Sequence, residues 1–176
     1  MSKQQKKNIA HADHILGTKT ATLELLEYGD FQCSSCGDSY LVVRKILREL
    51  KDSLVFVYRN FPLTEIHPDA FNAALAAEAA ALQNKFWEMY NILFQHQANL
   101  GVEALFYYAR QIGLDMNRFE QDIQSEALAT KIKEDMANGL HRGVSGTPSF
   151  FINGEKFEQD WSGDGLIGYL KELVQV

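Results

Sequence analysis

The sequence has little cysteine, proline or positive charge. Only two of its 176 residues are cysteine and three are proline. Lys and Arg number 17 against 23 Asp and Glu, which gives a net charge of −6. Binding to nucleic acid phosphates depends on clustered Lys and Arg, so this balance argues against a nucleic acid partner. The one basic cluster, Lys3 to Lys7, lies in a polar terminus typical of a solvated tail.

Long apolar runs are also missing. No stretch approaches the roughly 18 uninterrupted apolar residues that indicate a membrane-spanning helix. Residues 1–13 lack the apolar segment of a secretory signal, so the chain as read is expected in the cytoplasm. A periplasmic or other extracytoplasmic place is expected instead if a signal or anchor precedes it. The content of 46% apolar residues predicts an ordinary globular protein with one core.

The two cysteines lie close together, in Cys33-Ser34-Ser35-Cys36. They follow an apolar run typical of a buried strand, residues 21–29, and precede residues with helical hydrophobic spacing. A thiol at a helix N-terminus meets unpaired N–H groups and the positive end of the helix dipole, and both favour the thiolate. Because the thiolate is the reactive form, this placement indicates a redox site.

Two other uses of the cysteine pair are open from the residues alone. A structural disulfide gains its stability by closing a long loop, and so short a ring would add only about 2 kcal/mol. A zinc site needs about four ligands, but the chain has one Cys pair. Its histidines show no paired spacing: His11, His14, His67, His96 and His141. Neither use is favoured, and no metal is expected.

Hydrophobic periodicity predicts the order of the elements. After a polar lead-in to about Thr20, a strand over 21–29, a helix after the cysteines and a strand over 54–58 form a βαβ unit. From about 68 to 142 every segment has helical character, far more than the dozen or so residues that a crossover needs. We therefore expect an inserted helical subdomain, with its aromatic residues in the core rather than around a cofactor.

Polar residues and glycines mark the expected ends of elements. Asn84 and Asp115 can cap helices at their N-termini, and Gly113 can end one. Asn153-Gly154 is the favoured pair for a tight hairpin between two short strands, 149–152 and 156–157. Residues from 165 onward form a final amphipathic helix.

Three motifs occur in a fixed order: residues 30–37 with both cysteines, residues 58–63 (Tyr-Arg-Asn-Phe-Pro-Leu), and residues 143–154 with a Thr-Pro pair. With the helical insert between them, they resemble the DsbA-like thiol–disulfide oxidoreductases of the thioredoxin superfamily. The resemblance runs from about residue 14 to the C-terminus.

The resemblance implies an α/β, thioredoxin-like fold: a mixed β-sheet flanked by helices, with a large all-helical insertion. The expected division is an N-terminal part of the thioredoxin-like domain (1–62), the helical insertion (63–143) and a C-terminal part (144–176). The resemblance also implies redox exchange with protein thiols and no bound cofactor.

Residue roles follow from the same resemblance. The first cysteine of the family is the exposed nucleophile, so Cys33 is expected to attack and Cys36 to resolve the mixed disulfide. Thr147 and Pro148 are expected beside the pair, joined by a cis peptide bond, with their backbone presented to an extended substrate. Glu27 matches a buried acid that accepts a proton from Cys36, although strand alternation could turn its side chain outward.

The dipeptide between the cysteines departs from the family pattern. The family most often has Pro first, and strongly oxidising members have His second. Ser34 restores a backbone N–H and relaxes the backbone, and Ser35 offers a hydroxyl without positive charge. We therefore expect a less depressed Cys33 pKa and a milder oxidant.

The sequence thus predicts an enzyme that exchanges dithiol and disulfide with protein substrates and is reset by an unidentified redox partner. Its direction depends on that partner and on the compartment. The alternative is a thioredoxin-fold peptide-binding or chaperone-like module with a non-catalytic cysteine pair. A third possibility is an isomerase that uses a glutathione-like thiol, but such relatives generally lack the C-x-x-C pair.

Overall fold

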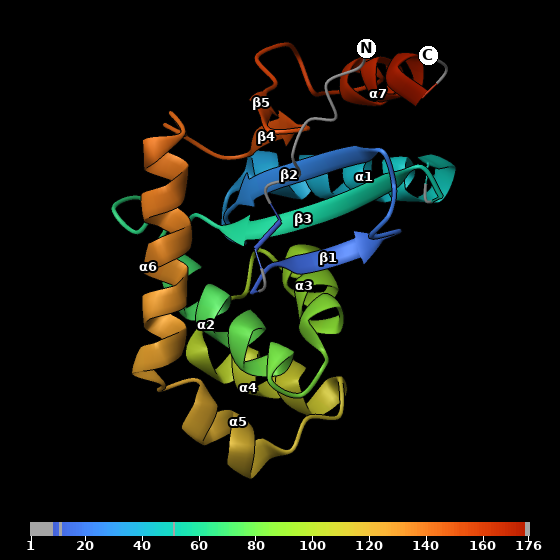
Figure 1. Ribbon diagram of the computed structural model, residues 1–176. Coiled ribbons are helices and arrows are strands. Elements are labelled where there is room, and N and C mark those ends of the chain that lie inside the picture. Colours follow the sequence, from blue (N-terminus) through green and yellow to red (C-terminus); the bar gives the residue numbers. More distant parts are fainter. Residues whose placement is uncertain (1–8, 11, 51, 175–176) are drawn as a thin grey trace. The chain divides into compact units, whose positions relative to one another are not determined.

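The structure, a computed structural model, describes residues 9–10, 12–50 and 52–174 (Figure 1). The chain divides into two compact units. The sheet unit comprises residues 1–28, 38–59 and 148–176, and the helical unit comprises residues 29–37 and 60–147.

A five-stranded mixed sheet in the described part of the chain has the order β1-β3-β2-β4-β5. The strands are β1 (His14–Gly17), β2 (Leu23–Gly29), β3 (Leu54–Asn60), β4 (Ser149–Ile152) and β5 (Glu155–Lys156). β1 is antiparallel to β3, and β4 is antiparallel to both β2 and β5.

The two central strands, β2 and β3, run parallel. At the N-terminal ends of the two strands, the Leu23 N–H donates to the Ser53 carbonyl at 3.3 Å. At their C-terminal ends, the Phe61 N–H donates to the Gly29 carbonyl at 2.7 Å. Every residue of both strands is buried, as is typical of parallel strands inside a sheet. The predicted βαβ unit is therefore present.

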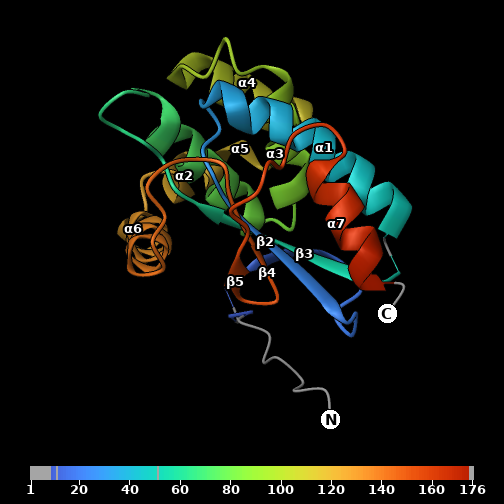
Figure 2. The same ribbon diagram turned by 90° about the horizontal axis from the view of Figure 1, so that it is seen from above.

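Two helices of the sheet unit lie side by side, α1 (Ser34–Leu50) and α7 (Gly165–Val174) (Figure 2). The Lys171 ammonium lies 2.6 Å from the Glu49 carboxylate, and Lys45 lies 2.7 Å from Asp164, just before α7. These ion pairs lie at the surface, where solvent screens the charges, so they add little to stability.

Strand β1 corrects the sequence prediction, which gave only a polar lead-in before the first strand. It pairs His14 with Tyr58 of β3. The next residue of β3, Arg59, donates to both carboxylate oxygens of Asp13 at 2.8 Å. These two side chains are only 7% and 3% exposed, so a buried bidentate ion pair fastens the lead-in to the sheet. A contact so distant in sequence leaves no trace in local periodicity.

The helical unit contains α2 (Ala70–Ala81), α3 (Phe86–Gln95), α4 (Val102–Gln111), α5 (Met116–Asp122) and α6 (Glu126–His141). Helix α2 contacts each of the other four. Apart from Glu78, its buried residues are all alanine, and such small side chains allow helices to approach on several sides. The expected helical insertion is confirmed.

The aromatic residues of this unit follow the prediction in part. Phe86, Tyr90 and Phe94 of α3 are buried, and the Tyr90 ring contacts both of the others. Tyr107 on α4 is 54% exposed, so the prediction that the aromatic residues of the insertion lie in the core is wrong for this residue.

The helix ends are formed mostly by the residues that the sequence indicates. The Asp115 side chain accepts an N–H from the first turn of α5 at 3.1 Å. Gly113 and Gly143 follow α4 and α6 with φ of +73° and +79°, a conformation that suits glycine. The prediction for Asn84 was wrong: it has φ of +58°, and the N-cap of α3 is Lys85, without a side-chain cap.

The β4–β5 hairpin turns at Asn153 and Gly154, with φ of +48° and +90°. Two positive φ values are what a two-residue type I′ turn requires, so the predicted hairpin is confirmed. Its second strand is Glu155–Lys156, one residue earlier than predicted. The division at 62/63 and 143/144 stays a prediction; the compact units differ in placing residues 29–37, with both cysteines, in the helical unit.

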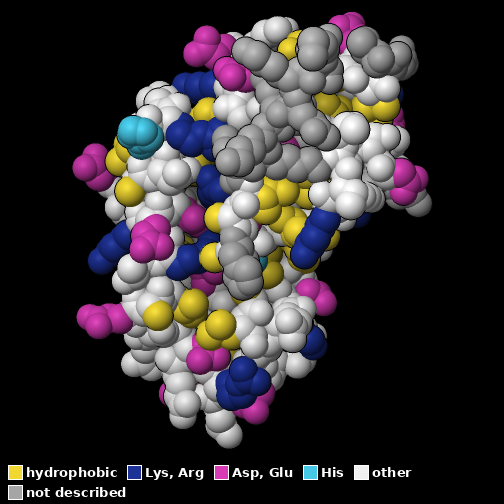
Figure 3. All heavy atoms as spheres, in the orientation of Figure 1, with side chains coloured by type: hydrophobic (Ala, Val, Ile, Leu, Met, Phe, Trp, Pro, Cys, Tyr) yellow, Lys and Arg dark blue, Asp and Glu magenta, His cyan; other side chains and the backbone are white. Residues whose placement is uncertain are grey.

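Charges of both signs are mixed on the face of the molecule shown in Figure 3. The described side chains of this face therefore form no continuous basic track of the kind that binds a phosphate backbone. Among the helices built from described residues, none has the length and apolar character needed to cross a bilayer.

The Asp13–Arg59 pair leads to a stability prediction. Asp13→Ala leaves the buried Arg59 guanidinium without its anion, which typically costs about 3–5 kcal/mol. We expect the free energy of unfolding, measured by urea denaturation, to fall by about that amount. The matched control is Asp13→Leu combined with Arg59→Met, which removes both charges and should be clearly less destabilised. Equal losses in the two variants would contradict the anchoring role.

Candidate active site

Both cysteines lie at the start of α1, as the sequence predicts. Cys33 immediately precedes the helix, and Cys36 lies in its first turn. The Cys33 carbonyl accepts the N–H groups of Cys36 at 3.0 Å and Gly37 at 3.2 Å, and the Cys33 N–H donates to the Asp30 carbonyl at 3.2 Å. Cys33 therefore occupies the N-cap position, where the helix dipole and unpaired N–H groups stabilise a negative charge.

The two sulfur atoms differ in their access to solvent. Both residues are free thiols; Cys33 is 8% exposed and Cys36 is fully buried. The Cys36 sulfur also accepts the Asp30 N–H at 3.4 Å. Cys33 keeps a small exposed area and Cys36 has none, and a nucleophile and a resolving thiol require an asymmetry in this direction.

The pKa of the Cys33 thiol is lowered from its ordinary value of 9.0 to about 5. The largest cause is a hydrogen bond from the Cys36 side chain, and the Thr147 side chain and the Cys36 backbone N–H act in the same direction. Burial and the charge of Asp30 raise the pKa, but they only partly offset these donors. Cys33 is therefore mostly thiolate at neutral pH.

Thr147 can interact with Cys33 in two ways: its main-chain carbonyl contacts the thiol, and its hydroxyl can donate to the thiolate. The Cys33 thiol donates to the Thr147 carbonyl at 3.4 Å. The Thr147 hydroxyl is buried and has no hydrogen-bond partner among the described residues. It is thus available to donate to the thiolate once the thiol has lost its proton. Pro148 follows in the sequence; its predicted cis peptide bond and its substrate contact stay predictions.

A glutamine from the segment between α3 and α4 holds the backbone of the cysteine turn. The Gln97 side-chain amide donates to the carbonyls of Phe31 and Cys33, each at 2.8 Å. Its oxygen occupies the space that a Cβ at Gly37 would fill. A side chain at this position would displace the Gln97 amide, and Gln97 is a site residue that sequence reasoning missed. Its long separation from the cysteines gives no local signal.

A second unpredicted group is Asp30, a buried carboxylate in the same turn. Its Oδ1 accepts the Gln32 N–H at 2.7 Å. Its Oδ2 accepts the Leu63 N–H at 2.8 Å and lies 2.8 Å from Nδ1 of His67. These bonds tie the turn to the segment that leads into α2.

The remaining predicted residues have less direct contacts. Glu27 on β2 is fully buried rather than turned outward, and it accepts the Ser39 hydroxyl of α1 at 2.8 Å. Glu27 and Cys36 belong to different compact units, so its role as proton acceptor stays a prediction. Ser34 and Ser35 are exposed, and the groups that shift the Cys33 pKa are Cys36, Thr147 and Asp30. The tuning role of the two serines also stays a prediction.

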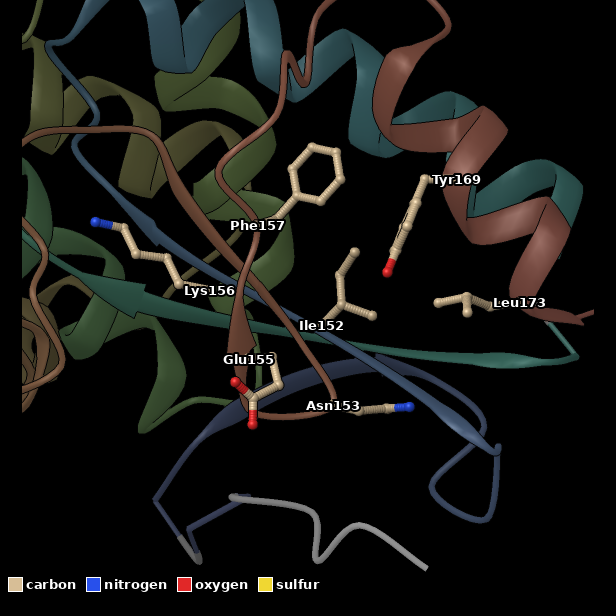
Figure 4. Close-up of a pocket in the computed structure, with 7 residues that line it drawn as sticks. All are labelled: Ile152, Asn153, Glu155, Lys156, Phe157, Tyr169 and Leu173. Carbon is tan, nitrogen blue, oxygen red and sulfur yellow. The ribbon is translucent and has the colours of Figure 1, made fainter. Parts of the chain in front are cut away.

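A separate hollow lies between the β4–β5 hairpin and α7 (Figure 4). Its volume of about 190 Å³ is below the range of roughly 300–1,000 Å³ typical of ligand pockets. It contains no thiol, and within the described residues no cluster of His, Cys, Asp and Glu could hold a metal ion. The cysteine turn is therefore the stronger candidate for chemistry.

Comparison with known sequences gives two findings. A family model for thioredoxin matches residues 10–172. The chain is 38% identical over 161 residues to the Na(+)/H(+) antiporter NhaA 1 of Mycobacterium sp. (strain KMS), covering 90% of this chain and 26% of that protein. For NhaA 1 of Salinispora arenicola the identity is 39% over 154 residues, covering 88% and 24%. The chain thus spans about a quarter of the length of these relatives.

Solved structures share the whole fold. A thioredoxin-like oxidoreductase from Silicibacter pomeroyi matches with a TM-score of 0.84 and 22% identity, over 95% of each chain. Oxidised BdbD from Bacillus subtilis matches with 0.81 and 18%, over 92% of each chain. The thiol-disulfide exchange protein alpha-DsbA2 from Wolbachia pipientis matches with 0.77 and 19%, over 93% of this chain and 88% of that one. At such identities the likeness establishes the fold.

The lowered Cys33 pKa can be measured directly. Titration of the reduced protein, followed by thiolate absorbance, should show a step with a midpoint near pH 5 that is missing in Cys33→Ser. Thr147→Val removes the hydroxyl but keeps the carbonyl, so its midpoint should be higher. Because the thiol has a pKa of 9.0 when unperturbed, the reduced protein should also lose stability as the pH falls from 9 to 5. A midpoint near 9 in the wild type would contradict the site geometry.

The close approach of Gln97 to Gly37 gives a second prediction for this site. Ala is normally favoured over Gly within a helix by about 0.5–1 kcal/mol. Gly37→Ala should instead lower the free energy of unfolding by about 1–2 kcal/mol, because the Gln97 amide must leave two carbonyls. In a Gln97→Ala background the same substitution should be neutral or stabilising. A stabilising effect in the wild-type background would contradict this arrangement.

Proposed function

Since the chain belongs to the thioredoxin family, with a DsbA-like helical insertion, we propose that it is a thiol–disulfide oxidoreductase that exchanges dithiol and disulfide with protein substrates. The observation that carries the proposal is the Cys33 thiol at the N-terminus of α1, with its pKa lowered to about 5 and Cys36 buried beside it. A structural disulfide or a packed cysteine does not need the low pKa.

When the reduced protein meets a substrate disulfide, the Cys33 thiolate attacks one of the two substrate sulfur atoms. A mixed disulfide forms and the other substrate sulfur leaves as a thiolate. Cys36 then loses its proton and attacks the Cys33 sulfur, which releases the second substrate thiolate and leaves a Cys33–Cys36 disulfide. Two electrons have passed from the protein to the substrate, and the reverse sequence oxidises a substrate dithiol.

The hydrogen bond from Cys36 to the Cys33 thiolate has a second consequence for this cycle. The same contact that lowers the Cys33 pKa keeps the Cys36 sulfur next to the sulfur that it must attack. Proximity of this kind raises the rate of the resolving step without further catalytic groups. For the proton of Cys36, the proposed acceptor is Glu27, whose carboxyl is buried on β2.

Substrate docking is proposed at Thr147 and Pro148. The Thr147 carbonyl already contacts the Cys33 sulfur, so a chain that pairs with the Thr147 backbone would bring its own sulfur close to Cys33. Pairing of an extended substrate with exposed backbone is a common mode of peptide recognition and does not depend on substrate sequence.

Oxidising strength is proposed to be intermediate. Thiol pKa values of about 3.5 and 7 accompany the strongly oxidising DsbA and the reducing thioredoxin, respectively. The value of about 5 for Cys33 lies between them. This supports the proposal of a milder oxidant with Ser34 and Ser35 between the cysteines.

The likeness to Na(+)/H(+) antiporters does not extend the proposal to ion transport, because the chain corresponds to about a quarter of those proteins. The redox partner that resets the pair decides the direction of exchange. Net oxidation is favoured outside the cytosol and net reduction within it, because the two compartments hold thiols at different potentials.

An activity assay tests the proposal. The wild-type protein should accelerate the reduction of insulin disulfides by dithiothreitol, and Cys33→Ser should return the rate to the uncatalysed background. Cys36→Ser should instead accumulate a covalent mixed disulfide with the substrate, visible on a non-reducing gel, because the resolving thiol is missing.

The competing function, a peptide-binding or chaperone-like module, predicts a different pattern in the same assay. It predicts no turnover by the wild type and no change on substitution of either cysteine. Trapping by Cys33→Ser rather than Cys36→Ser would show that the roles of the two cysteines are reversed.

A further inference from the structure

The main chain of Asp30 contacts both cysteines, Cys33 and Cys36. Its carbonyl accepts the Cys33 N–H at 3.2 Å, and its own N–H donates to the Cys36 sulfur at 3.4 Å. The residue is 1% exposed, so its side chain lies away from water. A charge at this position acts on the thiolate with little screening.

The Asp30 side chain has the hydrogen bonds of an ionised carboxylate. Oδ1 accepts one backbone N–H, from Gln32, and Oδ2 accepts another, from Leu63. The third neighbour is Nδ1 of His67, at 2.8 Å from Oδ2. Both oxygens therefore act as acceptors, and His67 supplies the contact that can carry positive charge.

The negative charge of Asp30 works against the proposed nucleophile. Like charges repel, and the Asp30 carboxylate raises the pKa of Cys33 against the larger effect of its hydrogen-bond donors. A negative charge next to a thiolate that must form is a cost to the site. His67 is placed where it can reduce that cost.

We propose that His67 is a positioning residue for the redox pair, which acts through Asp30: its hydrogen bond to the carboxylate withdraws negative charge from the surroundings of Cys33 and so stabilises the thiolate. The proposal rests on the proposed function, since it concerns the same cysteine pair. A more stable thiolate favours the reduced form, so His67 also makes the pair more oxidising.

Three other titratable residues of the described chain interact with the cysteine turn. Cys33 and Cys36 are the redox pair itself. Asp69 interacts with the turn indirectly, through two hydrogen bonds with the Gln32 side chain of 2.7 and 3.1 Å. The His67 side chain is 22% exposed, so replacing it does not open a fully buried cavity.

A purely structural role for His67 is the competing explanation. The residue lies just before α2, and its bond to Asp30 joins that segment to the cysteine turn. Loss of such a link would lower the stability of the fold, but any effect of replacing His67 on the Cys33 pKa would then not depend on the charge of Asp30. A double-mutant cycle separates the two explanations.

The experiment is the titration of Cys33 in the reduced full-length protein, for the wild type, His67→Leu, Asp30→Asn and the double variant. His67→Leu should raise the Cys33 pKa, with a change of roughly threefold or more in the acid dissociation constant. Asp30→Asn should lower it, because the amide keeps the shape but not the charge. In the Asp30→Asn background, His67→Leu should have little effect.

Two further measurements complete the test. His67→Asn keeps a donor near the place of Nδ1, so it is the control, and its midpoint should return toward the wild-type value. If His67→Leu does not fold, His67→Ala, which also lacks the donor, takes its place. The glutathione equilibrium constant of the cysteine pair should shift by the same factor as the thiol dissociation constant, toward the disulfide in His67→Leu.

An unchanged midpoint in His67→Leu, or an equal shift with and without the Asp30 charge, would overturn the proposal. Neither titration nor glutathione equilibrium uses a protein substrate. If the insulin assay fails but the His67 effect still depends on the Asp30 charge, the proposed function is wrong and the role of His67 stands. If the insulin assay succeeds but the His67 effect does not depend on that charge, only the role of His67 is wrong.

Discussion

The site depends on one constraint: the Cys33 sulfur must be held at the start of a helix by a turn, residues 30–33, that contains no helix or strand. Two side chains and one main-chain carbonyl of the helical unit meet this constraint. Gln97 binds two carbonyls of the turn, Asp30 binds the N–H of Leu63, and Thr147 contacts the Cys33 sulfur. The helical insertion is thus part of the candidate active site, and the compact units reflect this by grouping residues 29–37 with it.

The acidity of Cys33 is a balance of opposing effects rather than the result of one strong group. Donation from Cys36 is the largest effect, with Thr147 in the same direction, whereas burial and Asp30 oppose them. None of these causes is a cationic side chain. The thiolate is therefore stabilised by neutral hydrogen-bond donors and by the N-terminal end of the helix. Such a site can be adjusted in either direction by small changes around Asp30.

The sequence predicts what local patterns can carry. The cysteine pair between strand and helix, the turn at Asn153, the cap at Asp115 and the run of helices all follow from periodicity or from turn and cap chemistry. Strand β1 and the part of Gln97 in the site do not, because each depends on a polar contact between residues far apart in the chain. Hydrophobic patterns indicate which side of one helix or strand is buried, and they do not indicate which distant residue forms a polar contact with it.

The reduction potential of the Cys33–Cys36 couple, measured by equilibration of the wild-type protein with glutathione buffers, tests the central claim most directly. The account predicts a reversible two-electron equilibrium with a potential between about −270 mV for thioredoxin and about −120 mV for DsbA. A reduction potential below about −300 mV is typical of a structural disulfide. Such a value would contradict the claim that these two cysteines exchange electrons with substrates.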